Sequence, residues 1–221
     1  ALALPGAPAL RSWVALPLLL EGDVVGLLLA GRTAHDTFAE EELLRAKAVA
    51  FWAAAALRRA QLLAQVRRYA TLLEQVVEVD QRVFRGDGPE ALSPAILEGA
   101  CRIGDHRGGM LVLQTPRGPV VAATSGDAFA SVQGRPAPSD LASVAVRRLP
   151  AARMLDVAES LGAELPAQQV FLVPLATADG WLGCLVLLDP DGESPDDRLL
   201  EAYASRAAAA WRHAATHHAR P

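Results

Sequence analysis

One stretch of this chain occurs twice, and the repeat limits the possible folds more than any other feature. Residues 14–18 (VALPL) match residues 171–175 (FLVPL), and a polar turn and a second apolar run follow each of them. Pro17 and Pro174 are 157 residues apart, and Gly26 and Gly183 are separated by the same number of residues. Because the proline, the turn and the glycine all recur in register, the sequence predicts one β-hairpin present in two copies.

A helix start signal follows each hairpin. Residues 37–40 (TFAE) have the form of a capping box, in which a threonine and a glutamate cap the first turn of a helix. In the second copy, Ser194 precedes Pro195 and two aspartates, which is typical of a capped first turn. The repeated unit is therefore a hairpin followed by a helix.

The repeated proline and glycine call for a physical reason. Proline cannot donate to a strand ladder, so Pro17 and Pro174 predict a kink or bulge in the first strand of each hairpin. We expect Gly26 and Gly183 to allow a helix to approach the sheet closely.

Only the second copy is preceded by residues that complete a domain. Apolar spacing predicts a helix at 89–103, strands at 109–114 and 120–123, a helix starting at Ser139, and a short strand at 153–157. The helix at Ser139 is expected to present Leu141, Val144 and Ala145 along one face. The order of these elements predicts an α+β fold in which helices flank an antiparallel sheet.

Three segments of the first copy, at 11–18, 22–28 and 38–44, resemble the end of a GAF domain. Residues 170–188 and 194–200 repeat the pattern in the second copy. The resemblance implies a GAF- or PAS-like sensory domain in a bacterial signal-transduction protein such as a two-component system. Such domains usually precede an output domain, either a histidine kinase or a diguanylate cyclase.

The resemblance divides the chain into three parts. Residues 1–60 form the C-terminal half of a first GAF-like domain, 61–86 a coiled-coil linker helix, and 87–221 a second GAF-like domain. About 60 residues carry too little apolar surface for an independent core. The chain is therefore expected to be a fragment of a longer protein, or to have its first domain completed by another chain.

The linker carries a heptad pattern. Residues 39–84 contain no helix breaker, and the segment Arg85–Pro89 supplies glycine and proline to end the helix. Apolar residues alternate in steps of four and three if Asp80 fills one seam position. The predicted seam of a parallel homodimer is Leu62, Val66, Tyr69, Leu73, Val76 and Val83, and the flanking row is Leu63, Ala70, Val77 and Phe84. The alternative is a helix that packs on its own domain.

The GAF resemblance implies a ligand pocket between the sheet and the segment at 129–165. Arg147 and Arg148 could bind an anionic group, and Asp156 could accept a hydrogen bond. Phe129, Val132 and Met154 could form an apolar wall. The alternative is that both arginines are solvated and the pocket is collapsed. The identity of a ligand or cofactor stays open.

The sequence favours a non-catalytic protein. The five histidines are scattered, and no zinc helix motif, nucleophile elbow or phosphate loop is present. Cys101 and Cys184 are too few for the cysteine set of GAF-like methionine sulfoxide reductases, and neither is followed by the histidine of bilin-binding relatives. His213 and His217 have metal-compatible spacing, but a solvated helix end explains them as well.

Charge and hydropathy exclude two further partner classes. The net charge is −4 and basic residues form no stripe, so nucleic acid is not an expected partner. The apolar stretch at 13–30 is interrupted by residues 21–23 (EGD), which favours a hairpin over a membrane span and a cytoplasmic protein over a membrane protein.

The alternative function is the effector-binding part of a transcription regulator with a GAF-like fold.

Overall fold

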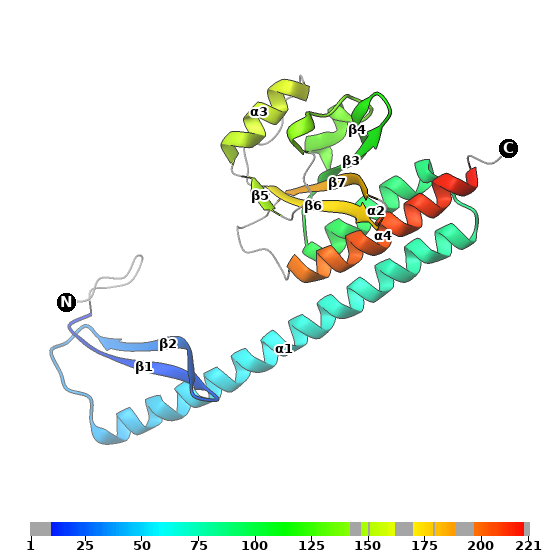
Figure 1. Ribbon diagram of the computed structural model, residues 1–221. Helices are drawn as coiled ribbons and strands as arrows, with labels where there is room; N and C mark the ends of the chain where they lie inside the picture. Colours follow the sequence, from blue (N-terminus) through cyan, green and yellow to red (C-terminus); the bar gives the residue numbers. More distant parts are fainter. Residues whose placement is uncertain are drawn as a thin grey trace. The chain divides into compact units, whose positions relative to one another are not determined.

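The computed structural model describes residues 10–141, 147–149, 151–161, 170–178, 180–188 and 197–218 (Figure 1). The chain divides into two compact units, the first ending at Arg67 and the second beginning at Arg68. Helix α1 (Glu40–Phe84) contributes residues to both units. Each unit is described by itself below.

The first unit contains one antiparallel hairpin and the N-terminal part of α1. Strands β1 (Ser12–Leu20) and β2 (Asp23–Arg32) pair along their length. Glu21 and Gly22 between them have positive φ angles of 51° and 99°, as a tight two-residue hairpin turn requires. Leu16 of β1 is buried, as are Ala50 and Ala54 of α1.

The start of α1 differs from the predicted capping box. The helix begins at Glu40, and the backbone N–H of Ala39 donates to Oε2 of Glu42 at 2.8 Å. This is the reciprocal half of a capping box, in which a third-position glutamate satisfies the capping N–H. The predicted pair, Thr37 and Glu40, is therefore wrong by two residues.

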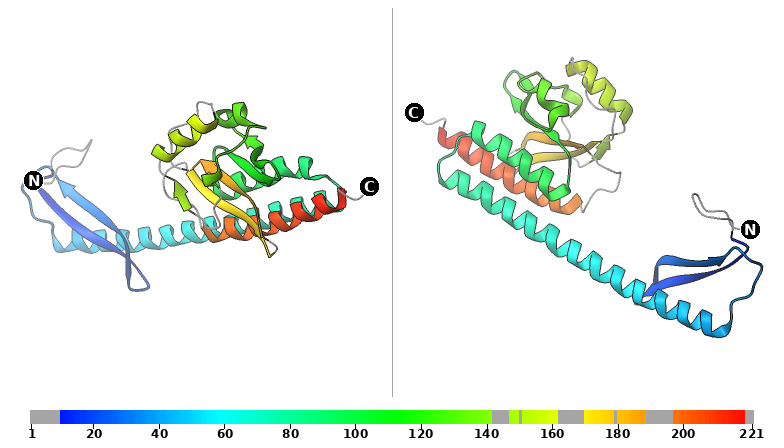
Figure 2. Two further views of the ribbon diagram at one scale, coloured as in Figure 1. Left: turned by 45° about the horizontal axis from the view of Figure 1, so that its top comes forward. Right: turned by 180° about the vertical axis from the view of Figure 1, so that it is seen from behind.

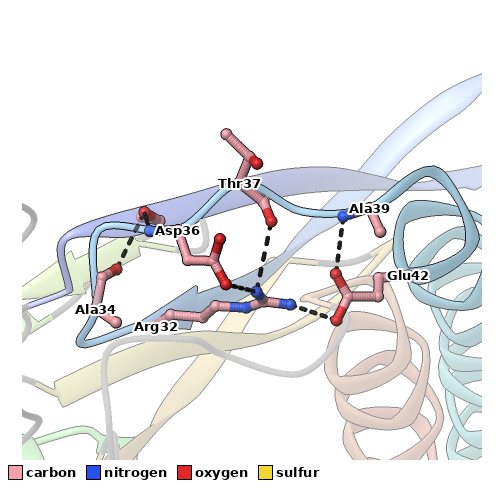
Figure 3. A network of polar contacts seen from close by, with 7 residues as sticks. Arg32, Ala34, Asp36, Thr37, Ala39 and Glu42 are labelled. Carbon is pink, nitrogen blue, oxygen red and sulfur yellow. Dashed lines mark hydrogen bonds and ion pairs between the residues drawn. The ribbon is translucent and has the colours of Figure 1, made fainter.

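Arg32 joins the end of β2 to this cap (Figure 3). Its guanidinium donates to Asp36 at 3.0 Å and to Glu42, and it lies 4.6 Å from the ring centroid of Phe38. The hydrogen bond from Ala39 lowers the pKa of Glu42, and the charge of Arg32 lowers it further. The connection between hairpin and helix is thus held by a charged network.

The second unit is an α+β domain. Over the described residues its sheet has the order β4-β3-β7-β6-β5, and all neighbours are antiparallel. Its elements are α2 (Pro89–Gly104), β3 (Gly109–Thr115), β4 (Gly118–Ser125), the 3₁₀ segments η1 (Asp127–Val132) and η2 (Ser139–Leu141), β5 (Arg147–Leu149), α3 (Ala151–Leu161), β6 (Val170–Thr177), β7 (Gly180–Leu188) and α4 (Asp197–His218). The predicted fold class is confirmed.

The two faces of this sheet bury different side chains. Leu111 and Leu185 point toward α2 and α4, and Val112 and Val186 point to the opposite face. Figures 1 and 2 show α2 and α4 on one side of the sheet, and η1 and α3 on the other. Each face therefore has its own apolar core.

The two hairpins match residue for residue. Both ladders shift register directly after the residue that follows the proline, between Leu18 and Leu19 and between Leu175 and Ala176. The matched pairs are Pro17↔Leu27 and Leu18↔Gly26 in the first copy, and Pro174↔Cys184 and Leu175↔Gly183 in the second. The predicted repeat is confirmed, but the extra residue of each bulge, Val25 or Leu182, lies in the second strand and not in the proline strand as expected.

The repeated glycine serves another purpose than the one predicted. A Cβ atom on Gly183 would lie 2.1 Å from the carbonyl oxygen of Val112 in β3. The close approach is therefore between two strands, and the expected approach of a helix is wrong for Gly183.

One predicted element has the wrong type. The segment 153–157 was expected as a strand, but it lies inside α3, and the strand of this region is β5. Val157, Ala158 and Leu161 are buried at helical spacing, which a window of five residues is too short to reveal. At Ser139 only a 3₁₀ turn forms over the described residues, which exclude Val144 and Ala145, and Ser194–Pro195 also lies outside them.

Helix α1 ends as predicted. It stops at Phe84, Gly86 adopts a φ of 86°, and the N–H of Asp87 donates to the carbonyl of Arg82 at 3.0 Å. In the described part of the chain, none of the helices combines the length and apolar character needed to cross a bilayer.

Candidate functional site

Two of the predicted ligand contacts lie inside the core beneath η1. Phe129 and Val132 are both 0% exposed and belong to the core cluster on the sheet face away from α2 and α4. Their neighbours in that cluster include Met110, Val112 and Leu172. The structure therefore brings these two residues together, with their side chains fully covered.

The remaining predicted contacts lie on β5 and α3. Arg147 and Arg148 pair with Leu172 and Phe171 of β6 through the backbone, but their side chains lie outside the described part of the structure. The side chain of Met154 in α3 lies outside it too. Asp156 is exposed on α3, and its carbonyl accepts a hydrogen bond from Ser160 at 2.9 Å. Ligand binding by these residues stays a prediction.

The sequence reasoning missed Arg135. Its Nη1 donates to the carbonyl of Leu161 at 2.6 Å, so it ties the segment after η1 to the last turn of α3. A cation at this end of a helix also complements the helix dipole. The same segment runs along β4, where the N–H of Val121 donates to the carbonyl of Arg135 at 2.9 Å. No local sequence signal marks this long-range contact.

The predicted dimer seam divides into two sets of residues. Leu62, Val66, Tyr69 and Leu73 are exposed, whereas Val76 and Val83 pack against the core of the second unit. Val76 and Val83 are partly buried there, and their role in a dimer seam stays a prediction. Leu72, Val76, Val79 and Val83 form an inward stripe on α1, which fits the alternative of a helix packed on its own domain.

The flanking row on α1 remains at the surface. Within the second unit, Ala70, Val77 and Phe84 of this row are exposed, as is Leu73 of the predicted seam, and with Asp80 these residues alternate in steps of three and four. Asp80 completes the spacing, and its carboxylate accepts two hydrogen bonds from Arg206 of α4, at 2.7 and 3.2 Å. This ion pair raises the pKa of Arg206. The polar position in the heptad thus has a partner inside its own domain.

A groove of about 650 Å³ lies between the C-terminal end of α1 and α4. Its lining includes Asp80, Phe84, Arg206, His213 and His217. The rings of His213 and His217 lie 4.4 Å apart, but the described residues contain no group of three or more potential metal ligands. The groove extends the exposed surface of α1 onto α4.

The two cysteines lie inside the second unit. Both are buried, and burial raises the pKa of the Cys101 thiol to about 11. A thiol with such a pKa is a poor nucleophile near neutral pH, because the thiolate is the reactive form.

No protein-family model matches this sequence, and no curated protein matches it. Solved structures do match. The phycoerythrobilin-bound GAF domain of a cyanobacterial phytochrome has a TM-score of 0.52 at 14% identity, covering 66% of this chain and 97% of that one. The GAF domain of an Acinetobacter phosphoenolpyruvate-protein phosphotransferase has a TM-score of 0.51 at 13% identity, covering 67% and 95%.

A third match is the GAF domain of a sensor histidine kinase from Pseudomonas syringae pv. tomato, with a TM-score of 0.49 at 25% identity, covering 68% and 92%. The cyanobacterial and Acinetobacter likenesses bear on the fold alone. Together with the antiparallel sheet and its flanking helices, they show that this chain has a GAF-like fold.

Proposed function

We propose that this chain is a non-catalytic sensory module of a bacterial signal-transduction protein, with two GAF-type domains in tandem. The GAF-like fold and the residue-for-residue match of the two hairpins support this proposal. The module would dimerise through α1 and relay its state to an output domain of the full-length protein. A ligand would be sensed at the sheet face beneath η1 and α3.

One observation carries the dimer part of the proposal. Phe84 is 93% exposed, Leu73 65% and Val77 51%, and all three lie on one stripe of α1. Large apolar side chains gathered at the surface mark an interaction site. Because the spacing along this stripe alternates between three and four once Ala70 and Asp80 are included, the partner that fits best is the same helix in a second copy.

Cysteine cross-linking tests this arrangement. Identical residues at a seam position face each other in a parallel, in-register pair, so Leu73→Cys is expected to form a disulfide between two copies under mild oxidation. Ser205→Cys, at an exposed position of α4, is the matched control and should stay monomeric on a non-reducing gel. The natural cysteines are buried, so the unmodified chain should not cross-link.

The proposal predicts a difference between these variants. Equal cross-linking of Leu73→Cys and Ser205→Cys would indicate random collision, and absence of cross-linking at position 73 would refute the parallel seam. If the dimer exists, light scattering at micromolar concentration should give twice the chain mass for both cysteine variants.

A further inference from the structure

Two histidines occupy neighbouring turns on one exposed face of α4. His213 and His217 are four residues apart, which places their side chains one above the other on a helix. Their ring centroids lie 4.4 Å apart. Both side chains are exposed, and neither imidazole has a hydrogen-bond or ion-pair partner among the described residues. The ring nitrogens are therefore accessible to a ligand from solvent.

The two rings line a groove and do not lie on a bare helix surface. The groove of about 650 Å³ is lined by α4 and by the end of α1 with the turn that follows it, including Asp87. Figures 1 and 2 show this end of α4 beside the α1–α2 connection, and a Cβ atom on Gly88 would lie 3.2 Å from Nε2 of His218. Two imidazoles and a carboxylate from separate segments therefore share one groove.

The residue types and their spacing fit a divalent transition-metal ion. Imidazole is a common ligand of Zn²⁺, Ni²⁺ and Cu²⁺, and histidines four residues apart on a helix can reach one such ion together. Each ring nitrogen must come within about 2.1 Å of the ion, and rings 4.4 Å apart can do so by rotation about their side-chain bonds. The described residues add no third ligand, so water would fill the remaining positions.

We propose that His213 and His217 bind one divalent transition ion such as Zn²⁺, and that Asp87 accepts hydrogen bonds from the water bound to it. The carboxylate of Asp87 lies 3.9 Å from Nη1 of Arg82, which is too long for a hydrogen bond. The last turn of a helix also favours a cation, because its carbonyl dipoles point outward there. The site depends neither on the dimer nor on a ligand at the sheet face beneath η1.

Calorimetric titration of residues 1–221 with Zn²⁺, repeated with Mg²⁺, tests the proposal. One Zn²⁺ should bind per chain, and Mg²⁺ should not bind, because it prefers oxygen ligands. His213→Gln and His217→Gln should each raise the Kd at least about 10-fold, since the loss of even an outer partner of a metal ligand costs that much. Circular dichroism of each variant checks that the helix content is unchanged.

The matched variant keeps all five histidines and changes only their spacing. His213→Ala combined with Ala209→His moves one imidazole by one turn along the same groove. The two rings then lie eight residues, or about 12 Å, apart along the helix axis and cannot share an ion. This variant should bind Zn²⁺ as weakly as His213→Gln does.

Two further variants test the surroundings of the ion. Nδ1 of His218 already donates to the carbonyl of Ala214 at 3.2 Å, so His218→Gln should leave the Kd within about threefold of the natural value. Asp87→Asn should raise the Kd by more than about threefold, but by less than the loss of either imidazole, because a neutral amide does not balance the charge of the ion.

The proposal is overturned if the chain binds no Zn²⁺, or if the variant with the moved histidine binds it as tightly as the natural chain. It is also overturned if His218→Gln weakens binding as much as His213→Gln, because any cluster of histidines would then suffice. An unchanged Kd in Asp87→Asn would refute the site in the groove. None of these measurements uses cross-linking along α1, so this proposal and the dimer can fail separately.

Discussion

Truncating the exposed stripe of α1 should weaken self-association sharply. We consider Leu73→Ala combined with Val77→Ala, because both side chains are exposed in the single chain and alanine preserves helix propensity. Complete burial of a leucine or valine side chain stabilises by about 2 kcal/mol. Weighted by exposures of 65% and 51%, the two side chains contribute about 2.3 kcal/mol per protomer.

A dimer buries both copies, so the total is about 4.6 kcal/mol, of which alanine retains a part. A loss of about 3–4 kcal/mol corresponds to a Kd raised by two to three orders of magnitude. Sedimentation velocity over a dilution series measures this change. Glu74→Ala is the matched control, since it lies beside Leu73 and is exposed but falls outside the apolar stripe.

Two results would refute this reasoning. One is an unmodified chain that stays monomeric at tens of micromolar. The other is a double variant whose Kd lies within about threefold of the Glu74→Ala value, because the stripe would then contribute no more than any exposed position.

Two further predictions concern ionisable groups. The pKa of Glu42 is lowered in the folded state, so its contribution to stability is complete above the ordinary glutamate value of about 4.3 and is lost as the pH falls through the lowered value. Glu42→Gln should remove this acid-dependent loss, as followed by thermal melts at a series of pH values. Because the pKa of Cys101 is about 11, only about one Cys101 thiol in a thousand is ionised at pH 8. Cys101 and Cys184 are both buried, so each should react with a thiol reagent only after the protein unfolds.

The local parts of the fold could be predicted because their signals are local. Turn residues and a strand proline lie within a few positions of one another, and each of the two hairpins carries them at matching positions. The type of the segment at 153–157 could not be predicted in this way, because β5 and α3 are short and adjacent, and the burial of Leu161 depends on the sheet beneath.

The seam shows another limit of sequence reasoning. Two rows on α1 have heptad spacing, one through Val76 and Val83 and one through Val77 and Phe84. Spacing alone predicts that a stripe is buried, but it does not tell which partner buries it. The structure assigns the first row to the core of its own domain and leaves the second exposed.

The two alternatives for the ligand face make opposite predictions for Phe129. If the side chain is a packed core residue, as its 0% exposure indicates, Phe129→Ala leaves a cavity and should cost about 3–5 kcal/mol in urea unfolding. If η1 instead lifts from the sheet to form an open pocket in solution, the ring is already partly hydrated and the cost should fall below about 1 kcal/mol. Ala128→Gly, at the neighbouring residue that is only partly buried, controls for the backbone of η1. If Phe129→Ala lowers the free energy of unfolding only slightly, and by no more than Ala128→Gly does, the result would favour a face that opens to admit a ligand.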